Sequence, residues 1–112
     1  MRLNKRMTVK EFLETIKNLE ETTYQIQITN RFMKSLDLSF RRNLDLGLLK
    51  DVIHTLAKGE KLAVKYRAHT LEGYKTVIWE CHVKPDWLLL WQQIENELVL
   101  ILLDTGSHSD LF

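Results

Sequence analysis

The chain has 112 residues, a formal net charge of +1 and 45% hydrophobic residues, which is enough apolar content to bury one modest core. Its longest apolar run, residues 98–103, is too short to cross a bilayer, so we expect no membrane-spanning segment and no membrane partner. The single cysteine, Cys81, excludes an internal disulfide and a cysteine-based zinc site, and it suits a reducing cytoplasm.

The charges are distributed unevenly along the chain. Residues 24–75 contain ten Lys and Arg against five acidic residues, whereas residues 76–112 contain one Lys against six acidic residues. A basic half of this kind can face phosphates or an acidic protein partner, but solvated helix faces produce the same pattern. Charge alone therefore leaves the kind of partner open.

The first expected element is an amphipathic helix within residues 8–22. Thr8 and Glu11 fit a capping box, in which each side chain bonds the other residue's backbone amide. Apolar residues then recur at helical spacing, namely Val9, Phe12, Leu13, Ile16 and Leu19. A helix this short is unstable alone in water. We therefore expect it to pack on the body of the protein or to cover a groove that a partner helix would occupy.

Residues 24–28 alternate with period two and predict a strand, and two helices should follow. Asn30 is the expected N-cap of the first helix, and Asp45 is the expected N-cap of the second. Lys58-Gly59 forms the stop signal of the second helix. We expect the two helices to form an antiparallel hairpin through residues 41–44.

The rest of the chain is predicted to be β-rich. Strands are expected over residues 74–83, 87–94 and 98–103, and the last is apolar at every position, as in a strand buried on both faces. The element order predicts an α+β fold in which a helical hairpin packs on a small, largely antiparallel sheet of about four strands, with an extra N-terminal helix.

Alternation along the strands also predicts the environment of several side chains. Cys81 should face the core, and the three tryptophans should serve packing. His54 lies opposite the apolar stripe of its helix and should be solvated. No two histidines have the spacing of metal ligands in a helix or strand, so we expect no metal site and no cofactor.

Three histidines lie beside turn signals, in residues 66–73, 80–87 and 105–112. These three blocks, in this order, resemble the YafQ-like branch of the RelE/ParE toxin superfamily. The most specific matches are His-Val-Lys-Pro-Asp-Trp at 82–87 and Thr-Gly-Ser-His-Ser-Asp-Leu-Phe at 105–112. The resemblance covers residues 24–112 as the toxin domain and leaves residues 1–23 as an N-terminal helical extension.

The resemblance implies a toxin of a bacterial type II toxin–antitoxin system. Such toxins are ribosome-dependent mRNA endoribonucleases that use no metal. A DinJ/RelB-type antitoxin holds them inactive, and we expect a toxin–antitoxin heterotetramer. The implied catalytic residues are His69, His82, Asp86 and His108. The implied supporting residues are Glu80 and Phe112, and Lys65, Arg67 and Lys75 are the residues expected to bind RNA.

The chemistry of metal-free RNA cleavage agrees with these residue types. One group must remove the proton of the 2′-hydroxyl, and another must protonate the leaving 5′-oxygen. An imidazole can take either role at neutral pH, for roughly 10²–10⁴-fold each. Asp86 can hold a neighbouring imidazole in one tautomer, and Phe112 can stack on a base. The sequence leaves open which histidine is the base.

Three of the implied catalytic residues also have a non-catalytic interpretation. His69 fits a surface loop, His82 a structural histidine, and Asp86 an ordinary turn. Relatives of this branch usually carry arginine where this chain has Trp79 and Asp104. Both replacements favour an alternative function on the same fold, either a ParE-like topoisomerase inhibitor or a degenerate toxin that only binds its antitoxin.

Overall fold

The structure is a computed structural model that describes residues 6–112. Residues 1–5 of the expected N-terminal extension lie outside the described residues. The helices are α1 (Val9–Lys17), α2 (Asn30–Arg41), α3 (Leu46–Ala57) and α4 (His108–Leu111), with a single 3₁₀ turn, η1 (Val64–Tyr66). The strands are β1 (Gln25–Ile28), β2 (His69–Leu71), β3 (Ile78–Lys84), β4 (Trp87–Ile94) and β5 (Val99–Gly106).

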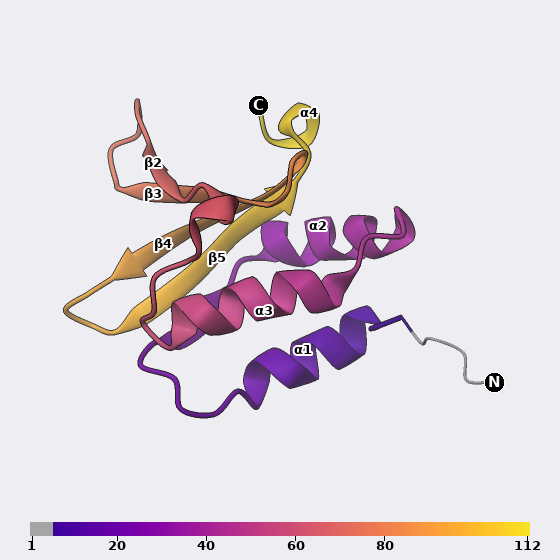
Figure 1. Cartoon of the computed structure of the whole chain (residues 1–112), viewed down its shortest axis with the longest axis horizontal. Helices are drawn as coiled ribbons and strands as arrows, with labels where there is room; N and C mark the ends of the chain where they lie inside the picture. The colour runs from indigo at the N-terminus through magenta and orange to yellow at the C-terminus, as the bar shows by residue number, and fades with distance from the viewer. Residues whose placement is uncertain (1–5) are drawn as a thin grey trace.

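The predicted α+β fold is confirmed, with a mixed sheet of five strands in the order β1-β5-β4-β3-β2 (Figure 1). β1 pairs parallel with β5, and the other neighbours are antiparallel. The sheet has one strand more than the expected four, because His69–Leu71 pairs with Ile78–Glu80 as a short edge strand. That pairing also makes residues 72–77 a loop, so β3 begins at Ile78 and the expected start at residue 74 is wrong.

α1, α2 and α3 cover one face of the sheet, the apolar core lies between them and the sheet, and α4 lies apart at the end of β5 (Figure 1). The two faces of β5 therefore differ in burial. Leu100 and Leu102 are fully buried toward the helices, whereas Ile101 and Leu103 are only half-buried on the other face. The expectation that this strand is buried on both faces was therefore wrong. Its continuous apolar run reflects its interior position in the sheet, between β1 and β4.

α1 begins at the predicted capping box but ends at Lys17, with Asn18 as its C-cap, rather than near residue 22. It packs on α3 and α2 (Figure 1). Phe12 is fully buried there, with its ring centroid 6.4 Å from that of Phe32. The helix thus contributes to the same core as the rest of the chain.

The N-cap of α2 is Thr29 and not the expected Asn30. The Thr29 hydroxyl accepts a hydrogen bond from the Phe32 amide at 3.0 Å and donates one to the Leu103 carbonyl at 2.8 Å. One side chain therefore starts α2 and fixes the helix to β5. Asp45 caps α3 as predicted, because its carboxylate accepts from the Gly47 amide at 2.9 Å.

Most of the environments predicted for single side chains are confirmed. Cys81 is fully buried, and burial, aided by the nearby charge of Glu80, raises the pKa of its thiol to about 12. Trp87 and Trp91 are buried and Trp79 is half-buried. His54 is half-buried rather than solvated, because the segment after α1 places the Glu20 carbonyl 3.4 Å from its Nε2.

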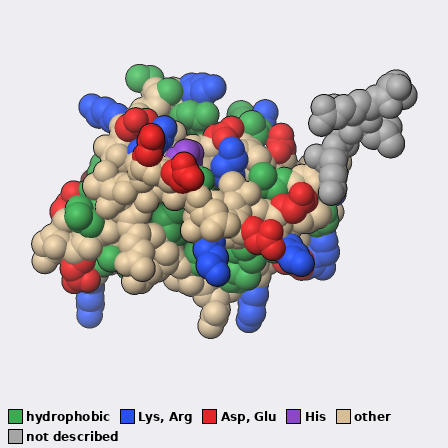
Figure 2. All heavy atoms as spheres, turned by 90° about the horizontal axis from the view of Figure 1, so that it is seen from below, with side chains coloured by type: hydrophobic (Ala, Val, Ile, Leu, Met, Phe, Trp, Pro, Cys, Tyr) green, Lys and Arg blue, Asp and Glu red, His purple; other side chains and the backbone are tan. Residues whose placement is uncertain are grey.

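The face seen from below carries charges of both signs. Figure 2 shows Lys and Arg side chains interspersed with Asp and Glu across this face, without a patch of one sign. This face therefore offers no extended surface of one charge to a polyanion. None of the helices in residues 6–112 is long and apolar enough to cross a membrane.

Candidate active site

Three histidines from separate parts of the chain meet in one cluster. His69 lies in β2, His82 in β3, and His108 begins α4. The ring centroids of His69 and His82 are 6.5 Å apart, and those of His82 and His108 are 5.7 Å apart. The antiparallel pairing of β2 with β3 and the return of α4 from the end of β5 bring together residues up to 39 positions apart in the sequence.

Glu80 supplies a buried negative charge to this cluster. It lies directly opposite His69 in the β2–β3 register and is 6% exposed. Its Oε1 is 3.2 Å from Nε2 of His69 and 3.9 Å from Nε2 of His82. A carboxylate this buried needs cationic or hydrogen-bonding partners, and the two imidazoles can provide them when they are protonated.

Asp86 orients the third histidine from the turn between β3 and β4. Its carboxylate accepts hydrogen bonds from the backbone nitrogen of His108 at 2.9 Å and from the ring Nδ1 at 2.6 Å. These bonds, the backbone bond first, hold the pKa of Asp86 below its usual value of 3.8. Asp86 is therefore both a turn residue and the partner of His108.

The Nδ1 atoms of the other two histidines also face oxygen acceptors. His82 Nδ1 is 3.2 Å from the Pro85 carbonyl, and His69 Nδ1 is 2.8 Å from the Arg67 carbonyl. A carbonyl or ionised carboxylate oxygen can only accept, so Nδ1 carries a hydrogen in each of the three rings. Nε2 is then the nitrogen of His82 and His108 that can exchange a proton with a substrate.

α4, which carries His108, is held by contacts that sequence reasoning missed. Arg42 at the end of α2 binds Asp110, with Nη1 2.6 Å from Oδ2. This pairing leads the contacts that lower the pKa of Asp110 to about 2. Gly106 lets α4 fold back closely, because a Cβ there would lie 2.9 Å from Asp110 Oδ2. The one sequence signal was the spacing of Ser107 and Asp110, which form a capping box.

Two of the three expected RNA-binding residues lie beside the cluster. Lys65, Arg67 and His82 line one pocket of about 410 Å³. Arg67 has a left-handed backbone, with φ of 53°, which is uncommon for a residue with a side chain. Lys75 lies in the loop between β2 and β3, and no contact recorded for residues 6–112 joins it to the histidines.

Phe112 follows α4, and its ring is 61% exposed. Its backbone nitrogen donates to the His108 carbonyl at 2.9 Å. Phe112 is therefore an exposed aromatic residue held one helical turn from His108, and an exposed ring of this kind can stack on an unpaired base.

Neither Trp79 nor Asp104 makes a contact with the histidine cluster. Trp79 stacks on Trp91 on the opposite face of β3 from Glu80, with ring centroids 6.0 Å apart. Asp104 is 6% exposed and faces α2, where it pairs with Arg31 at 2.9 Å and accepts from the Ser35 hydroxyl at 2.5 Å. Asp104 therefore has its own counter-ion and fixes α2 to β5.

A metal site is not evident in the part of the chain that the structure describes. No group of three or more His, Cys, Asp and Glu side chains in residues 6–112 is arranged to hold a metal ion. In the cluster, Nδ1 of each imidazole faces an oxygen acceptor.

Residues 24–112 match the family described as "Bacterial toxin of type II toxin-antitoxin system, YafQ". The chain is 28% identical over 88 residues to the mRNA interferase toxin YafQ of Escherichia coli strain K12, covering 78% of this chain and 94% of that protein. A metal-bound toxin from Helicobacter pylori is 40% identical, with a TM-score of 0.76, covering 80% of this chain and 99% of that one. YafQ in the E. coli DinJ-YafQ toxin-antitoxin complex is 28% identical, with a TM-score of 0.73, covering 80% and 98%.

Proposed function

Because the chain belongs to the YafQ family of type II toxin–antitoxin toxins, we propose that it is an mRNA endoribonuclease that acts on the ribosome without a metal cofactor. The observation that supports this most directly is the meeting of His69, His82 and His108, with His108 held by Asp86. The name mRNA interferase borne by the E. coli relatives agrees with an activity on RNA.

The proposed reaction is an attack of the 2′-oxygen on the neighbouring phosphorus. One imidazole, acting through Nε2, takes the 2′-hydroxyl proton. The bond from phosphorus to the 5′-oxygen breaks, and a second imidazole gives that oxygen a proton. The products are a 2′,3′-cyclic phosphate and a 5′-hydroxyl. Each proton transfer is worth roughly 10²–10⁴-fold.

His82 and His108 are the residues we assign to these transfers, because each has its Nδ1 occupied and no hydrogen bond is recorded for its Nε2 among residues 6–112. The Glu80 carboxylate lies 3.9 Å from His82 Nε2, beyond hydrogen-bond distance. Both ring nitrogens of His69 face acceptors, Arg67 O and Glu80 Oε1. Only the imidazolium form can donate to both, so His69 is suited to placing positive charge by the scissile phosphate. Arg67 and Lys65 add charge on the same side, Lys75 adds charge from its loop, and Phe112 is positioned to stack on a base.

The partner that restrains this activity is a cognate antitoxin of the DinJ type. Two related structures are complexes of E. coli YafQ with DinJ, and this chain covers 98% of the YafQ chain in each. We extend this pairing to the present chain and propose an assembly of two toxins with two antitoxins. In this proposal the toxin domain is residues 24–112, and residues 1–23 are an extension. Its helix α1 contributes buried side chains to the core of the toxin domain.

Mapping of mRNA ends by primer extension after induced expression tests the activity. The wild-type chain should inhibit growth and produce new cleavage sites within translated mRNA. His82→Ala and His108→Ala should each abolish both effects, because each removes a proton-transfer group. The circular dichroism spectrum of each variant should match that of the wild type, and this check matters most for His82, whose side chain is 15% exposed against 54% for His108.

His54→Ala is the matched control, because His54 lies on α3 and makes no recorded contact with the three histidines. It should retain full toxicity. Growth inhibition without mRNA cleavage, undisturbed by the His82 and His108 variants, would instead establish the non-catalytic alternative. Full cleavage by both variants would refute the assigned mechanism.

A further inference from the structure

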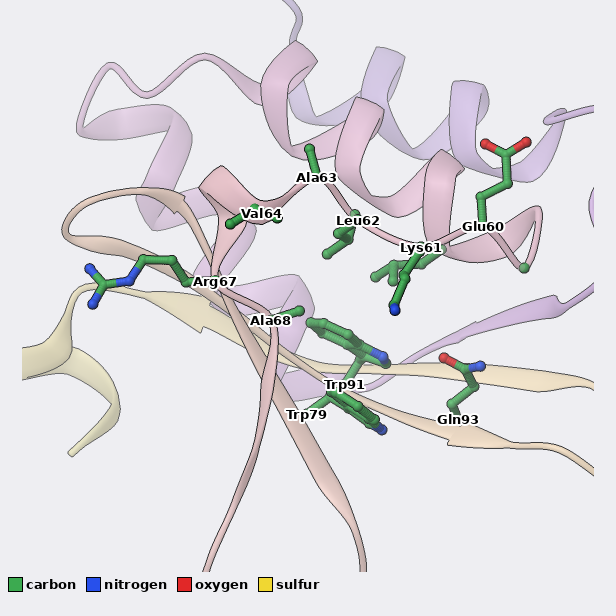
Figure 3. A pocket seen from close by; sticks show the side chains of 12 residues that line it. Glu60, Lys61, Leu62, Ala63, Val64, Arg67, Ala68, Trp79, Trp91 and Gln93 are labelled. Carbon is green, nitrogen blue, oxygen red and sulfur yellow. The ribbon is translucent and has the colours of Figure 1, made fainter.

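A second pocket lies on the face of β3 away from the histidine cluster. It has a volume of about 710 Å³ and lies between the C-terminal end of α3, residues 59–68 and the strands β3 and β4 (Figure 3). Its walls are largely apolar, with Trp79 and Trp91 on one side and Leu56, Leu62 and Ala68 around them. The catalytic proposal uses none of these five side chains.

The indole of Trp91 has an unused hydrogen-bond donor. Trp91 is 2% exposed, and its Nε1 has no acceptor among residues 6–112. Trp87, at the other end of β4, donates from Nε1 to the Thr105 hydroxyl at 3.0 Å. In Figure 3 the nitrogen edges of Trp79 and Trp91 lie on the side where Lys61 and Gln93 stand. A buried donor without an acceptor is unfavourable, so an incoming acceptor in this pocket would be stabilised.

The rim of the pocket has an exposed apolar side chain and unpaired positive charge. Val64 is 92% exposed. The acidic rim residue Glu60 already pairs with Lys58 at 3.4 Å. No ion pair is recorded for Lys61 or Arg67 in the described part of the chain, so the uncompensated charge at the rim is positive. An apolar opening surrounded by positive charge suits an acidic partner that inserts an apolar side chain.

We propose that this pocket is a docking site for an acidic segment of the antitoxin. The segment inserts one apolar side chain against Leu62 and the half-buried Trp79, brings an oxygen acceptor to the Nε1 edge of Trp91, and places carboxylates near Lys61 and Arg67. The identity of the partner rests on the proposed function, whereas the chemistry of the site does not. A nucleic acid fits less well, because both faces of the buried Trp91 ring are covered and a base has no open face there on which to stack.

Arg67 connects this pocket to the catalytic side. It lines the pocket over Trp91 and also the pocket that contains His82. A carboxylate that binds Arg67 from the first pocket neutralises the positive charge of Arg67. That charge is then no longer offered to RNA at the pocket that contains His82. The antitoxin could then weaken RNA binding without covering the histidines.

The indole N–H signals in a ¹H–¹⁵N spectrum of the full chain provide the first test. Trp79→Phe and Trp87→Phe assign the three signals, so the assignment does not depend on a Trp91 variant that might fail to fold. Addition of full-length cognate antitoxin should move the Trp91 signal downfield and slow its exchange with solvent. The Trp87 signal should stay in place because its donor is already bonded.

The second test is calorimetry with the same antitoxin. Val64→Asp should weaken binding by about tenfold or more, because it places a like charge opposite an acidic segment. Val77→Asp is the matched control, because Val77 is 63% exposed and lies outside the pocket lining. It should leave the affinity within about twofold.

An unmoved Trp91 signal together with equal affinities for both Asp variants would overturn the docking site. A Trp91 signal that responds to single-stranded RNA and not to antitoxin would overturn it in favour of an RNA pocket. Neither experiment uses cleavage as its readout. A protein that binds its antitoxin through this pocket but cuts no RNA would contradict the proposed function alone.

Discussion

His108 donates two hydrogen bonds to the carboxylate of Asp86, one from its backbone nitrogen at 2.9 Å and one from ring Nδ1 at 2.6 Å. The backbone bond fixes where α4 begins, and the ring bond fixes which nitrogen of His108 points away from Asp86. One turn residue therefore sets both the position and the tautomer of a proposed catalytic group.

The pKa of Asp86 should be measurably below its usual value in the folded protein, because both bonds favour the carboxylate. His108→Ala removes the ring bond but keeps the backbone bond, which is the larger cause. The pKa should then rise only part of the way. A depressed pKa stabilises the folded state above the unfolded value near 3.8 and loses that effect as the pH falls. Carboxyl ¹³C titration of both proteins checks this, and a complete return to the usual value would show that the ring bond acts alone.

Arg42→Gln should disturb catalysis from outside the histidine cluster. Arg42 leads the interactions that lower the pKa of Asp110 to about 2, so its loss should raise that pKa toward 3.8 and loosen α4. A displaced His108 should reduce kcat by roughly 10–100-fold with a smaller effect on KM. In the wild type, the stabilisation that this pair provides should disappear as the pH falls from about 4 to about 2.

Arg41→Gln is the control for that experiment. Arg41 pairs with Asp37 at 3.2 Å on the surface of α2, one turn apart along the helix, and makes no recorded contact with α4. Its removal should change stability by less than about 0.5 kcal/mol and leave kcat unchanged. Equal losses of activity in the two variants would mean that Arg42 contributes general charge rather than the position of α4.

Cleavage should survive removal of free metal from the toxin. Imidazole proton transfer needs no metal, and the histidines here are bonded to oxygen acceptors. Toxin treated with EDTA and then desalted should retain full activity on ribosomes that keep their own magnesium. A stoichiometric zinc in untagged, purified protein, or activity that returns only when zinc is restored, would contradict the metal-free mechanism.

Phe12→Ala should destabilise the protein by about 3–5 kcal/mol, because it removes a fully buried ring that packs on Phe32. Lys10→Ala, at an exposed position of the same helix, should change stability by less than about 0.5 kcal/mol. Denaturant titration of the two variants measures the contribution of α1. A small effect of Phe12→Ala would show that α1 is a detachable appendage of the toxin core.

Local patterns predicted the elements whose causes are local. The capping residues Thr8 and Asp45 and the limits of β4 follow from side chains that act within a few positions. The short strand β2 was missed because three residues carry no usable period, and only pairing with β3 makes them a strand. Thr29 and Asn30 are adjacent and both are common N-cap residue types, so local sequence does not distinguish them. The additional contact of Thr29, its hydrogen bond to the Leu103 carbonyl, joins residues 74 positions apart.

The same limit applies to the candidate site. The histidines and Asp86 could be predicted because their motifs resemble a known family, but their ring contacts could not. The Arg42–Asp110 pair joins residues 68 positions apart, and no spacing rule connects them. The unpaired Trp91 donor is a property of the folded interior and has no signal in the sequence.

The place of β5 in the sheet has a consequence for incomplete chains. β5 lies between β1 and β4 and, among residues 6–112, is the only strand that pairs with β1, so residues 25–28 have no partner there until residues 99–102 are in place. Contacts between such distant segments form late in folding, because a long loop must close first. A chain cut before residue 99 would lack β5, which contains Asp104, and α4, which begins at His108. Proteolytic fragments that end before residue 99 should therefore not inhibit growth, and toxicity should require the C-terminal segment.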